Sequence, residues 1–207
     1  MPPRLNDPRI RQFLLPWLRR QDPSLWIREE MGLHGCVADL VTVSQEEVHV
    51  YEIKSDVDTT GRLGDRVKKG RYGRTWTRRG QITAYSAMAD RVTLVVGTEL
   101  LEEARLLIPP WWGIIVALDE FPEVELLPHR PALLNPDLRW VNVYRYLWRQ
   151  EAEDICVRLG IGRGMKGASR ARLKKRLKEH PLTLDQLRRE VRRVLRTRVW
   201  GKFPGRR

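Results

Sequence analysis

Hydrophobic and polar positions follow two periodicities along the first 136 residues. The runs VADLVTV (37–43) and VHVYEIK (48–54) are rich in β-branched residues, and four polar residues (44–47) separate them, which predicts a β-hairpin. Similar patterns predict further strands at 26–31, 91–97, 113–118 and, as an edge strand, 124–127. Helical patterns are expected at 8–20, with a bend near Pro16, at 81–89 and at 99–107. Because strands alternate with helices, the sequence predicts an α/β core.

From about residue 137 onward the strand pattern disappears and a helical pattern replaces it. Apolar residues recur every three or four positions between Leu184 and Val199, and Thr183 with Gln186 has the form of a capping box. Ser169 is the expected N-cap of a preceding helix, and the glycine-rich segment 160–167 is interpreted as a connection between helices. We therefore expect two regions, a core at 1–136 and a basic helical region at 137–207.

The net charge of +13 is concentrated in the C-terminal part of the chain. Residues 1–149 hold 21 Lys and Arg against 20 Asp and Glu, whereas residues 150–207 hold 18 against 6. A region this basic is typical of proteins that bind a polyanion, most often nucleic acid, although a solvated helix surface gives a similar composition.

Composition argues against several other classes of protein. Two cysteines, Cys36 and Cys156, without a Cys/His cluster indicate neither a disulfide framework nor a zinc site, which fits the cytoplasm. The longest apolar run, 111–118, is too short to cross a membrane, and no membrane role is expected. The oligomeric state stays open, with a homodimer among the options.

The predicted hairpin brings three charged residues together. If residues 44–47 form the turn, Asp39 lies across from Glu52, and Lys54 projects from the same face. Two close carboxylates repel each other unless a cation lies between them, and Mg²⁺ prefers oxygen ligands of this kind. The alternative is an exposed cross-strand ion-pair cluster with no chemical role.

The D-x12-E-x-K arrangement of these residues resembles the signature of the PD-(D/E)XK, or restriction-endonuclease-like, nuclease superfamily. The resemblance extends over EIKSDVDT (52–59), RL (62–63), QITAY (81–85), ADRVTLVV (89–96) and IPPWWGI (108–114). Within that superfamily it is similar to a bacterial and phage family of largely uncharacterised predicted nucleases. The resemblance implies a restriction-endonuclease-like mixed sheet flanked by helices.

The resemblance also implies an activity and a set of site residues. The activity is a deoxyribonuclease, with endonuclease the favoured mode, that uses Mg²⁺ or Mn²⁺ and activated water to hydrolyse phosphodiester bonds of DNA. The implied catalytic residues are Glu30, Asp39, Glu52, Lys54, Gln81 and Tyr85. The implied metal ligands are Asp39, Glu52, Glu30 and the backbone carbonyl of Ile53.

Two departures from the family pattern stand out. Val37 occupies a position where arginine is more usual, and a basic insertion (66–79) separates RL from the Gln81 helix. The insertion holds seven Lys and Arg, no acid and an aromatic Trp76, so it is interpreted either as a DNA-binding loop or as a mobile solvated loop. The expected nucleic-acid-binding residues are Arg66, Lys68, Lys69, Arg71, Arg74, Trp76, Arg78, Arg79, Lys166, Arg170, Arg172, Lys174 and Lys175.

Several alternatives remain at the level of sequence. Asp56 and Asp58 either support the metal site or belong to a turn, and Trp111 with Trp112 is expected to form a packing corner rather than a platform for bases. The chain is either a nuclease, a non-catalytic nucleic-acid-binding protein on the same scaffold, or an accessory or regulatory module of a phage or mobile element. Substrate specificity, strand preference and metal count are not determined by these patterns.

Overall fold

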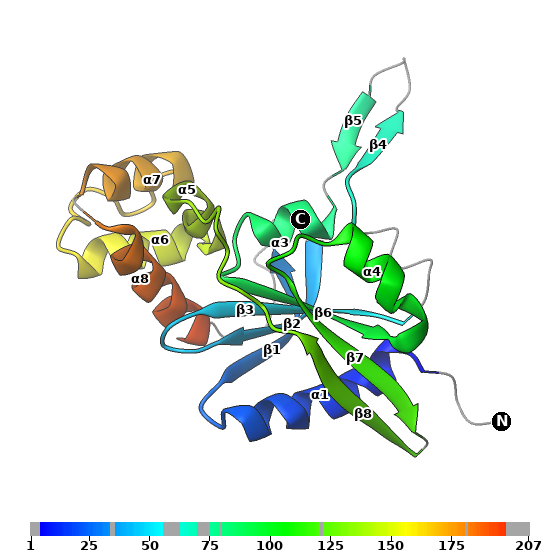
Figure 1. The fold of residues 1–207 in the computed structure, drawn as a ribbon. Helices are drawn as coiled ribbons and strands as arrows, with labels where there is room; N and C mark the ends of the chain where they lie inside the picture. The colour runs from blue at the N-terminus through cyan, green and yellow to red at the C-terminus, as the bar shows by residue number, and fades with distance from the viewer. Residues whose placement is uncertain are drawn as a thin grey trace.

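The computed structural model describes residues 5–33, 36–55, 63–69, 75–78, 80–120, 122–180 and 182–197. Within these ranges the chain forms a six-stranded mixed sheet with helices on both faces, followed by a helical C-terminal region (Figure 1). The predicted α/β fold class, with a mixed sheet flanked by helices and a helical C-terminal region, is therefore confirmed.

The strand order in the sheet is β1-β2-β3-β6-β7-β8. The strands are β1 (Trp26–Leu33), β2 (Cys36–Val43), β3 (Val48–Lys54), β6 (Arg91–Gly97), β7 (Gly113–Glu120) and β8 (Glu123–Arg130). Strands β3, β6 and β7 are parallel to one another, and the other neighbours are antiparallel. The run predicted as an edge strand is β8, which does lie at the sheet edge.

The register of the β2–β3 hairpin is the predicted one over four pairs, from Val43 opposite Val48 to Leu40 opposite Tyr51. The backbone N–H of Ser44 donates to the carbonyl of Glu47 at 3.0 Å and closes the turn. Beyond Leu40 the regular pairing of backbones ends, and the side chain of Asp39 accepts the N–H of Ile53 at 2.8 Å instead. The predicted backbone pairing of Asp39 with Glu52 is thus replaced by a side-chain contact one residue further along β3.

Two hydrophobic clusters occupy the two faces of the sheet. On one face α1 (Asp7–Gln21) buries Ile10, Leu14 and Leu18 against a cluster that includes Ile53 and Val95. The opposite face packs against α3 (Gln81–Ser86), the 3-10 turn η2 (Thr98–Leu100) and α4 (Leu101–Leu107). Trp112, fully buried in this second cluster, confirms the predicted packing corner.

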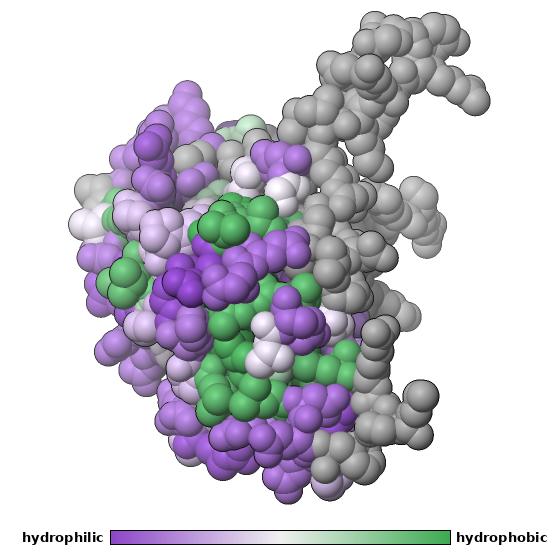
Figure 2. Space-filling view, turned by 45° about the vertical axis from the view of Figure 1, so that its right-hand side comes forward, coloured by the Kyte–Doolittle hydropathy of each residue, from purple (hydrophilic) through white to green (hydrophobic). Residues whose placement is uncertain are grey.

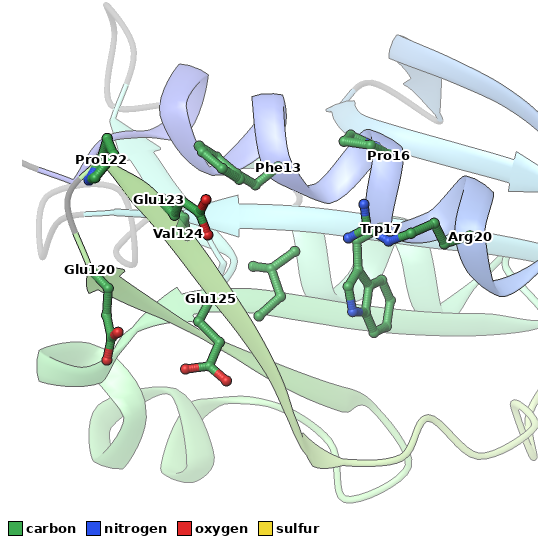
Figure 3. Close-up of a pocket in the computed structure, with 10 residues that line it drawn as sticks. Phe13, Pro16, Trp17, Arg20, Glu120, Pro122, Glu123, Val124 and Glu125 are labelled. Carbon is green, nitrogen blue, oxygen red and sulfur yellow. The ribbon is translucent and has the colours of Figure 1, made fainter.

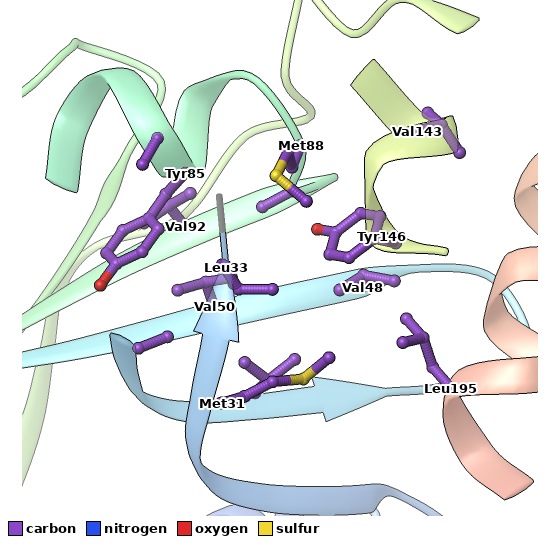
Figure 4. Close-up of a cluster of buried hydrophobic side chains, with 14 of the residues drawn as sticks. Met31, Leu33, Val48, Val50, Tyr85, Met88, Val92, Val143, Tyr146 and Leu195 are labelled. Carbon is purple, nitrogen blue, oxygen red and sulfur yellow. The ribbon is translucent and has the colours of Figure 1, made fainter. Parts of the chain in front are cut away.

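The C-terminal helices share their hydrophobic core with this second face of the sheet. They are α5 (Trp140–Val143), the 3-10 turn η3 (Tyr144–Tyr146), α6 (Arg149–Arg158), α7 (Arg170–Glu179) and α8 (Leu184–Thr197). Figure 4 shows Tyr146 and Leu195 of this region beside Val48 of β3 and Met31 of β1. The sheet and the basic helical region are therefore packed together through one continuous cluster.

The predicted helix caps in this region are present. The Ser169 side chain accepts the N–H of Arg172 at 3.3 Å, and Thr183 and Gln186 exchange hydrogen bonds of 2.8 and 3.2 Å. In the glycine-rich connection Gly160, Gly164 and Gly167 adopt positive φ angles near 70°, which other residues rarely adopt. Val199, the last position of the predicted apolar pattern, lies outside the described residues.

The basic insertion is not a simple loop, because it contains a two-stranded antiparallel sheet, β4 (Arg66–Lys69) and β5 (Thr75–Arg78), that projects from the body of the protein (Figure 1). Its base is closed by two hydrogen bonds, from Ile82 N to the Leu63 carbonyl at 3.0 Å and from Gly80 N to Asp65 Oδ1 at 2.6 Å. A Cβ atom on Gly80 would lie 2.2 Å from the Gly64 carbonyl oxygen, so this close approach of two backbones requires glycine.

Hydrophobic side chains also reach the surface, in areas bordered by hydrophilic ones (Figure 2). Exposed leucines lie on α4 (Leu106 and Leu107), on β8 (Leu127) and just beyond β8 (Leu133 and Leu134). None of the helices formed by the described residues has the length and apolar character needed to cross a membrane.

An ion pair joins α8 to the sheet. Asp90, only 4% exposed, accepts the N–H of Val48 at 2.7 Å through Oδ2, and the Arg188 guanidinium lies 2.5 Å from Oδ1. Burial raises the pKa of Asp90, while the Val48 N–H and the guanidinium of Arg188 act in the opposite direction. The carboxylate is therefore held charged mainly by partners that the α8 helix and the β3 strand supply.

We expect Arg188→Gln to lower the free energy of unfolding by about 3 kcal/mol, since it removes the guanidinium that contacts the buried Asp90 carboxylate. Adding Asp90→Asn should restore part of this loss, because an amide oxygen can still accept the Val48 N–H. Urea denaturation of both single variants and the double variant measures the coupling. Additive effects of the two substitutions would contradict the assignment of this pair as a link between α8 and the sheet.

Candidate active site

Glu52 and Lys54 lie at the C-terminal end of β3, between β2 and β6, and both side chains are buried, with 1% and 4% of their surface exposed. The Lys54 ammonium and the Gln81 side-chain amide both donate to Glu52 Oε1. The Tyr85 hydroxyl lies 2.8 Å from Glu52 Oε2 and also 2.8 Å from the Val37 carbonyl, and its single proton serves one of them at a time. A buried carboxylate is thus surrounded by three side-chain donors.

Helix α3 supplies two of these donors because Gln81 and Tyr85 are four residues apart and therefore share one helix face. Gln81 is the first residue of the helix, directly after the closed base of the β4–β5 hairpin. Tyr85 is fully buried and stacks near Trp112, with ring centroids 6.3 Å apart. The structure turns this shared face toward Glu52, so both side chains that the family resemblance implies at the site contact its carboxylate.

The environment of Glu52 favours its protonated form. Its pKa is raised to about 7, because burial and the nearby Asp39 carboxylate raise it more than the Lys54 ammonium and the Tyr85 hydroxyl lower it. A carboxyl group that titrates near neutral pH, beside an ammonium, is typical of sites where proton transfer or cation binding takes place.

Asp39 lies between α1 and β3 and connects them. Its Oδ1 accepts a hydrogen bond from Arg11 Nη2 at 2.9 Å, and its Oδ2 accepts the Ile53 N–H at 2.8 Å. Burial raises the pKa of Asp39, whereas the Ile53 N–H and the charges of Lys54 and Arg11 lower it. Because Lys54 acts on both carboxylates, Asp39 and Glu52 belong to one electrostatic cluster.

Arg11 is a member of this cluster that sequence analysis did not identify. Besides Asp39, its guanidinium contacts Glu30 at 3.3 Å and Glu29 at 3.7 Å. A basic residue next to the buried Ile10 in an amphipathic helix is normally interpreted as solvent-exposed, so local pattern gives no signal for this role. The only local indication is that Arg11 borders the buried stripe of α1.

Glu30 reaches the cluster only through Arg11. Its side chain is 71% exposed, and its backbone has a φ of 50°, a conformation that non-glycine residues rarely adopt. Strained backbone of this kind is often found at functional sites, but here the carboxylate is turned toward solvent. The structure therefore places Glu30 near Asp39 without bringing it to Glu52.

The oxygen atoms around Lys54 have the chemistry that a hard divalent cation requires. The Lys54 ammonium bonds both Glu52 Oε1 and, at 3.1 Å, the Ile53 carbonyl, so a cation already bridges two of the predicted ligands. Gln81 Oε1 is buried nearby and has no hydrogen-bond partner among the described residues. No three His, Cys, Asp or Glu side chains in the described part of the chain form a metal cluster.

The predicted nucleic-acid-binding residues of the C-terminal region do not converge on this cluster. Lys166 lies in the glycine-rich connection, and Arg170, Arg172, Lys174 and Lys175 lie on α7. On this helix the Arg170 guanidinium is 5.9 Å from the centre of the Tyr144 ring, and the Lys175 ammonium is 3.8 Å from the Glu179 carboxylate. Figure 1 shows α7 and the β4–β5 hairpin at separate ends of the molecule. The side chains of residues 66–79, as well as Asp56 and Asp58, lie outside the described part of the structure.

A hollow of about 510 Å³ between α1 and β8 is separate from this cluster. Figure 3 shows Phe13 and Trp17 of α1 facing the strand, with the carboxylates of Glu120, Glu123 and Glu125 around them. None of the predicted site residues lines it, and we assign it no part in the candidate site.

The raised pKa of Glu52 predicts a pH dependence of stability. Because the folded carboxyl group keeps its proton up to about pH 7 while the unfolded one loses it near pH 4.5, the free energy of unfolding should fall as pH rises between these values. Glu52→Gln should lack this component, which amounts to about 3 kcal/mol. Urea denaturation at pH 4 to 8 measures it, with the exposed Glu102→Gln as control. Parallel curves for Glu52→Gln and wild type would contradict the raised pKa.

Comparison with known proteins adds a family but not an activity. No curated protein matches the chain. A solved structure of a protein of unknown function from Silicibacter pomeroyi is 20% identical, with a TM-score of 0.42, and the match covers 76% of this chain and 94% of that one. The family described as Bacteriophage P4 protein cII matches residues 3–202, nearly the whole chain. The chain therefore belongs to the Bacteriophage P4 protein cII family.

Proposed function

We propose that this protein is a metal-dependent DNA nuclease that hydrolyses phosphodiester bonds with activated water. The observation that carries the proposal is the buried Glu52 carboxylate at the end of β3, in contact with Lys54, Gln81 and Tyr85 and electrostatically coupled to Asp39. These are the residues for which the sequence resembles the PD-(D/E)XK superfamily. The comparisons with known proteins assign no activity to the chain, so the proposal rests on this cluster and on that resemblance.

A purely structural role accounts poorly for the burial of this cluster. Burying a carboxylate and an ammonium costs desolvation free energy, and well-packed apolar residues at the same positions often give equal or higher stability. Both Glu52 and Lys54 lie in a strand whose other residues are mostly buried and apolar. A requirement for charge at this position is therefore more easily explained by chemistry than by folding.

In the proposed reaction Asp39, Glu52 and the Ile53 carbonyl would hold Mg²⁺ or Mn²⁺, and Gln81 Oε1 is the further oxygen nearby. The bound metal would polarise the phosphate and lower the pKa of a water molecule. Lys54, released from Glu52, would be placed to orient that water and to stabilise negative charge on the phosphate in the transition state. Tyr85 would hold the Glu52 carboxylate in position through Oε2.

A second candidate function is nucleic-acid binding without catalysis. It is favoured by the fact that all four carboxylate oxygens of Asp39 and Glu52 accept hydrogen bonds from protein donors, as expected of a site that needs no metal. Membership of a family named after a phage protein is compatible with the related possibility of an accessory or regulatory module of a phage. Either alternative predicts DNA binding that does not depend on Glu52 or Lys54.

Variants of the cluster separate the enzyme from the binding protein. We expect Asp39→Ala and Glu52→Gln to lose cleavage of DNA with Mg²⁺ or Mn²⁺ because they remove ligands, and Lys54→Met to lose it at least 100-fold because charge stabilisation disappears. All three should bind DNA as tightly as wild type when Ca²⁺ replaces Mg²⁺. The measurement pairs cleavage of single-stranded, nicked, branched and duplex DNA with binding to the same substrates.

The matched control is Glu102→Ala, which removes an exposed carboxylate on α4 and should retain full activity. All variants are purified in the same way, since a contaminating nuclease would cleave equally in each preparation. Wild-type protein that cleaves none of these substrates, or Glu52→Gln and Lys54→Met variants that cleave like wild type, would leave the binding protein as the better assignment.

A further inference from the structure

A second hollow, of about 540 Å³, lies between α8 and the sheet, at the end opposite to Glu52. It is formed where α8 passes the start of β1 and the turn between β2 and β3 (Figure 1). Its lining residues are Ser24, Leu25, Trp26, Ser44, Gln45, Arg189, Arg192, Arg193 and Arg196. The volume lies within the range of sites that bind small organic ligands.

Four arginines of α8 give this hollow a positively charged lining. Positions 189, 192, 193 and 196 fall on one helix face by their spacing of three and four, while Leu187, Val191 and Leu195 are buried on the other. No carboxylate lines the hollow, and among the described residues Arg189, Arg192 and Arg196 form no ion pair. Arg193 is the exception, with Glu190 at 3.1 Å.

Of the four arginines, Arg192 gives the most direct indication of a binding site, because it is the most buried. It is only 7% exposed, and its Nε atom is buried without a hydrogen-bond partner. Burial lowers its pKa, as do the charges of Arg188 and Arg189, whereas the carboxylates of Asp90 and Asp185 raise it. A largely buried guanidinium whose Nε has no partner can still donate a hydrogen bond to a bound anion, and leaving that buried group unpaired is costly.

The hollow between α1 and β8 shows that an arginine-rich lining is not a general property of hollows on this protein. That hollow is lined by three glutamates and one arginine, Arg20, so it has the opposite charge. Of these two hollows, only the α8 hollow has a positive lining that would attract an anion. Phosphate is a suitable anion because a guanidinium group donates several hydrogen bonds in one plane.

The other side of the hollow carries groups suited to a nucleobase. Trp26 borders it while also packing partly against the hydrophobic core, so its indole is held in place. Ser24, Ser44 and Gln45 add side-chain donors and acceptors. An aromatic ring beside clustered arginines is the combination that proteins use to bind single-stranded nucleic acid, with bases stacked on the ring and phosphates on the arginines.

We propose that the α8 hollow binds a nucleotide unit of a nucleic acid strand, with its phosphates on Arg189, Arg192 and Arg196 and its base against Trp26. The site is distinct from the Glu52 cluster, since the four residue steps of β3 from Val48 to Glu52 separate them by roughly 13 Å at about 3.3 Å per residue. It binds the strand whether or not the protein cleaves DNA, and its test needs no metal. Sequence analysis interpreted the basic region that contains α8 as typical of nucleic-acid binding, but it named neither these arginines nor Trp26 among the expected contacts.

The test measures binding of fluorescein-labelled dT12 and of a 12-base-pair duplex by fluorescence anisotropy, in EDTA, with the full-length protein. We expect Arg189→Gln/Arg196→Gln to weaken binding of dT12 roughly tenfold and to reduce the slope of log K against log salt concentration by about 1.4, the value for two phosphate contacts. The matched control is Arg19→Gln/Arg20→Gln, which removes the same charge from the exposed end of α1. Equal effects of the two double variants would overturn the site.

Two further arms identify the ligand. Trp26→Leu should weaken binding of dT12 more than binding of the duplex, and Trp26→Phe should restore most of it, since a base needs an aromatic surface to stack on. AMP and inorganic phosphate should compete with dT12 only at much higher concentration. Competition by either at concentrations similar to dT12, or equal behaviour of the Leu and Phe variants, would overturn the assignment to a nucleic acid strand. Failure of the cleavage assays would leave this result unchanged.

Discussion

The burial of Glu52 in the sheet is the constraint on which the candidate site depends. A carboxyl group with 1% of its surface exposed needs hydrogen-bond donors from several directions, and here β3 supplies Lys54 while α3 supplies Gln81 and Tyr85. Meeting that need fixes the position of α3 over the end of β3. It also fixes where the β4–β5 hairpin emerges, because the base of the hairpin is hydrogen-bonded to the first turn of the same helix.

The two faces of the sheet contribute differently to the site. Helix α1 covers one face and brings Arg11 to Asp39, whereas the other face is covered by α3, α4 and the C-terminal helices through one continuous hydrophobic cluster. Because Asp39 accepts hydrogen bonds from Arg11 and from the Ile53 backbone, it links the α1 side to the strand that carries Glu52. The cluster is thus held by long-range contacts on both faces rather than by the hairpin alone.

Charge is distributed in two separate groups along β3. At the C-terminal end of the strand, carboxylates and Lys54 form a nearly balanced, buried cluster suited to a cation. At its N-terminal end, α8 presents four arginines, of which three form no ion pair among the described residues. The ion pair of Arg188 with Asp90 anchors α8 beside the second group, so the position of the arginines depends on the same packing that buries Leu195 and Val48 (Figure 4). A strand of nucleic acid bound on this side would meet positive charge before it reached the carboxylates.

The sequence by itself determined the features that depend on neighbouring residues. The register of the β2–β3 hairpin follows from the turn at 44–47, the caps at Ser169 and Thr183 follow from local hydrogen bonds, and the shared helix face of Gln81 and Tyr85 follows from helical spacing. The contact of that face with Glu52 depends on how α3 packs on the sheet. Tertiary structure alone decided the contact of Arg11 with Asp39, the hairpin within the basic insertion and the arginine-lined hollow beside Trp26. These depend on how helices far apart in sequence pack across the sheet, and exposed polar residues in a helix pattern give no information about which neighbour they will meet.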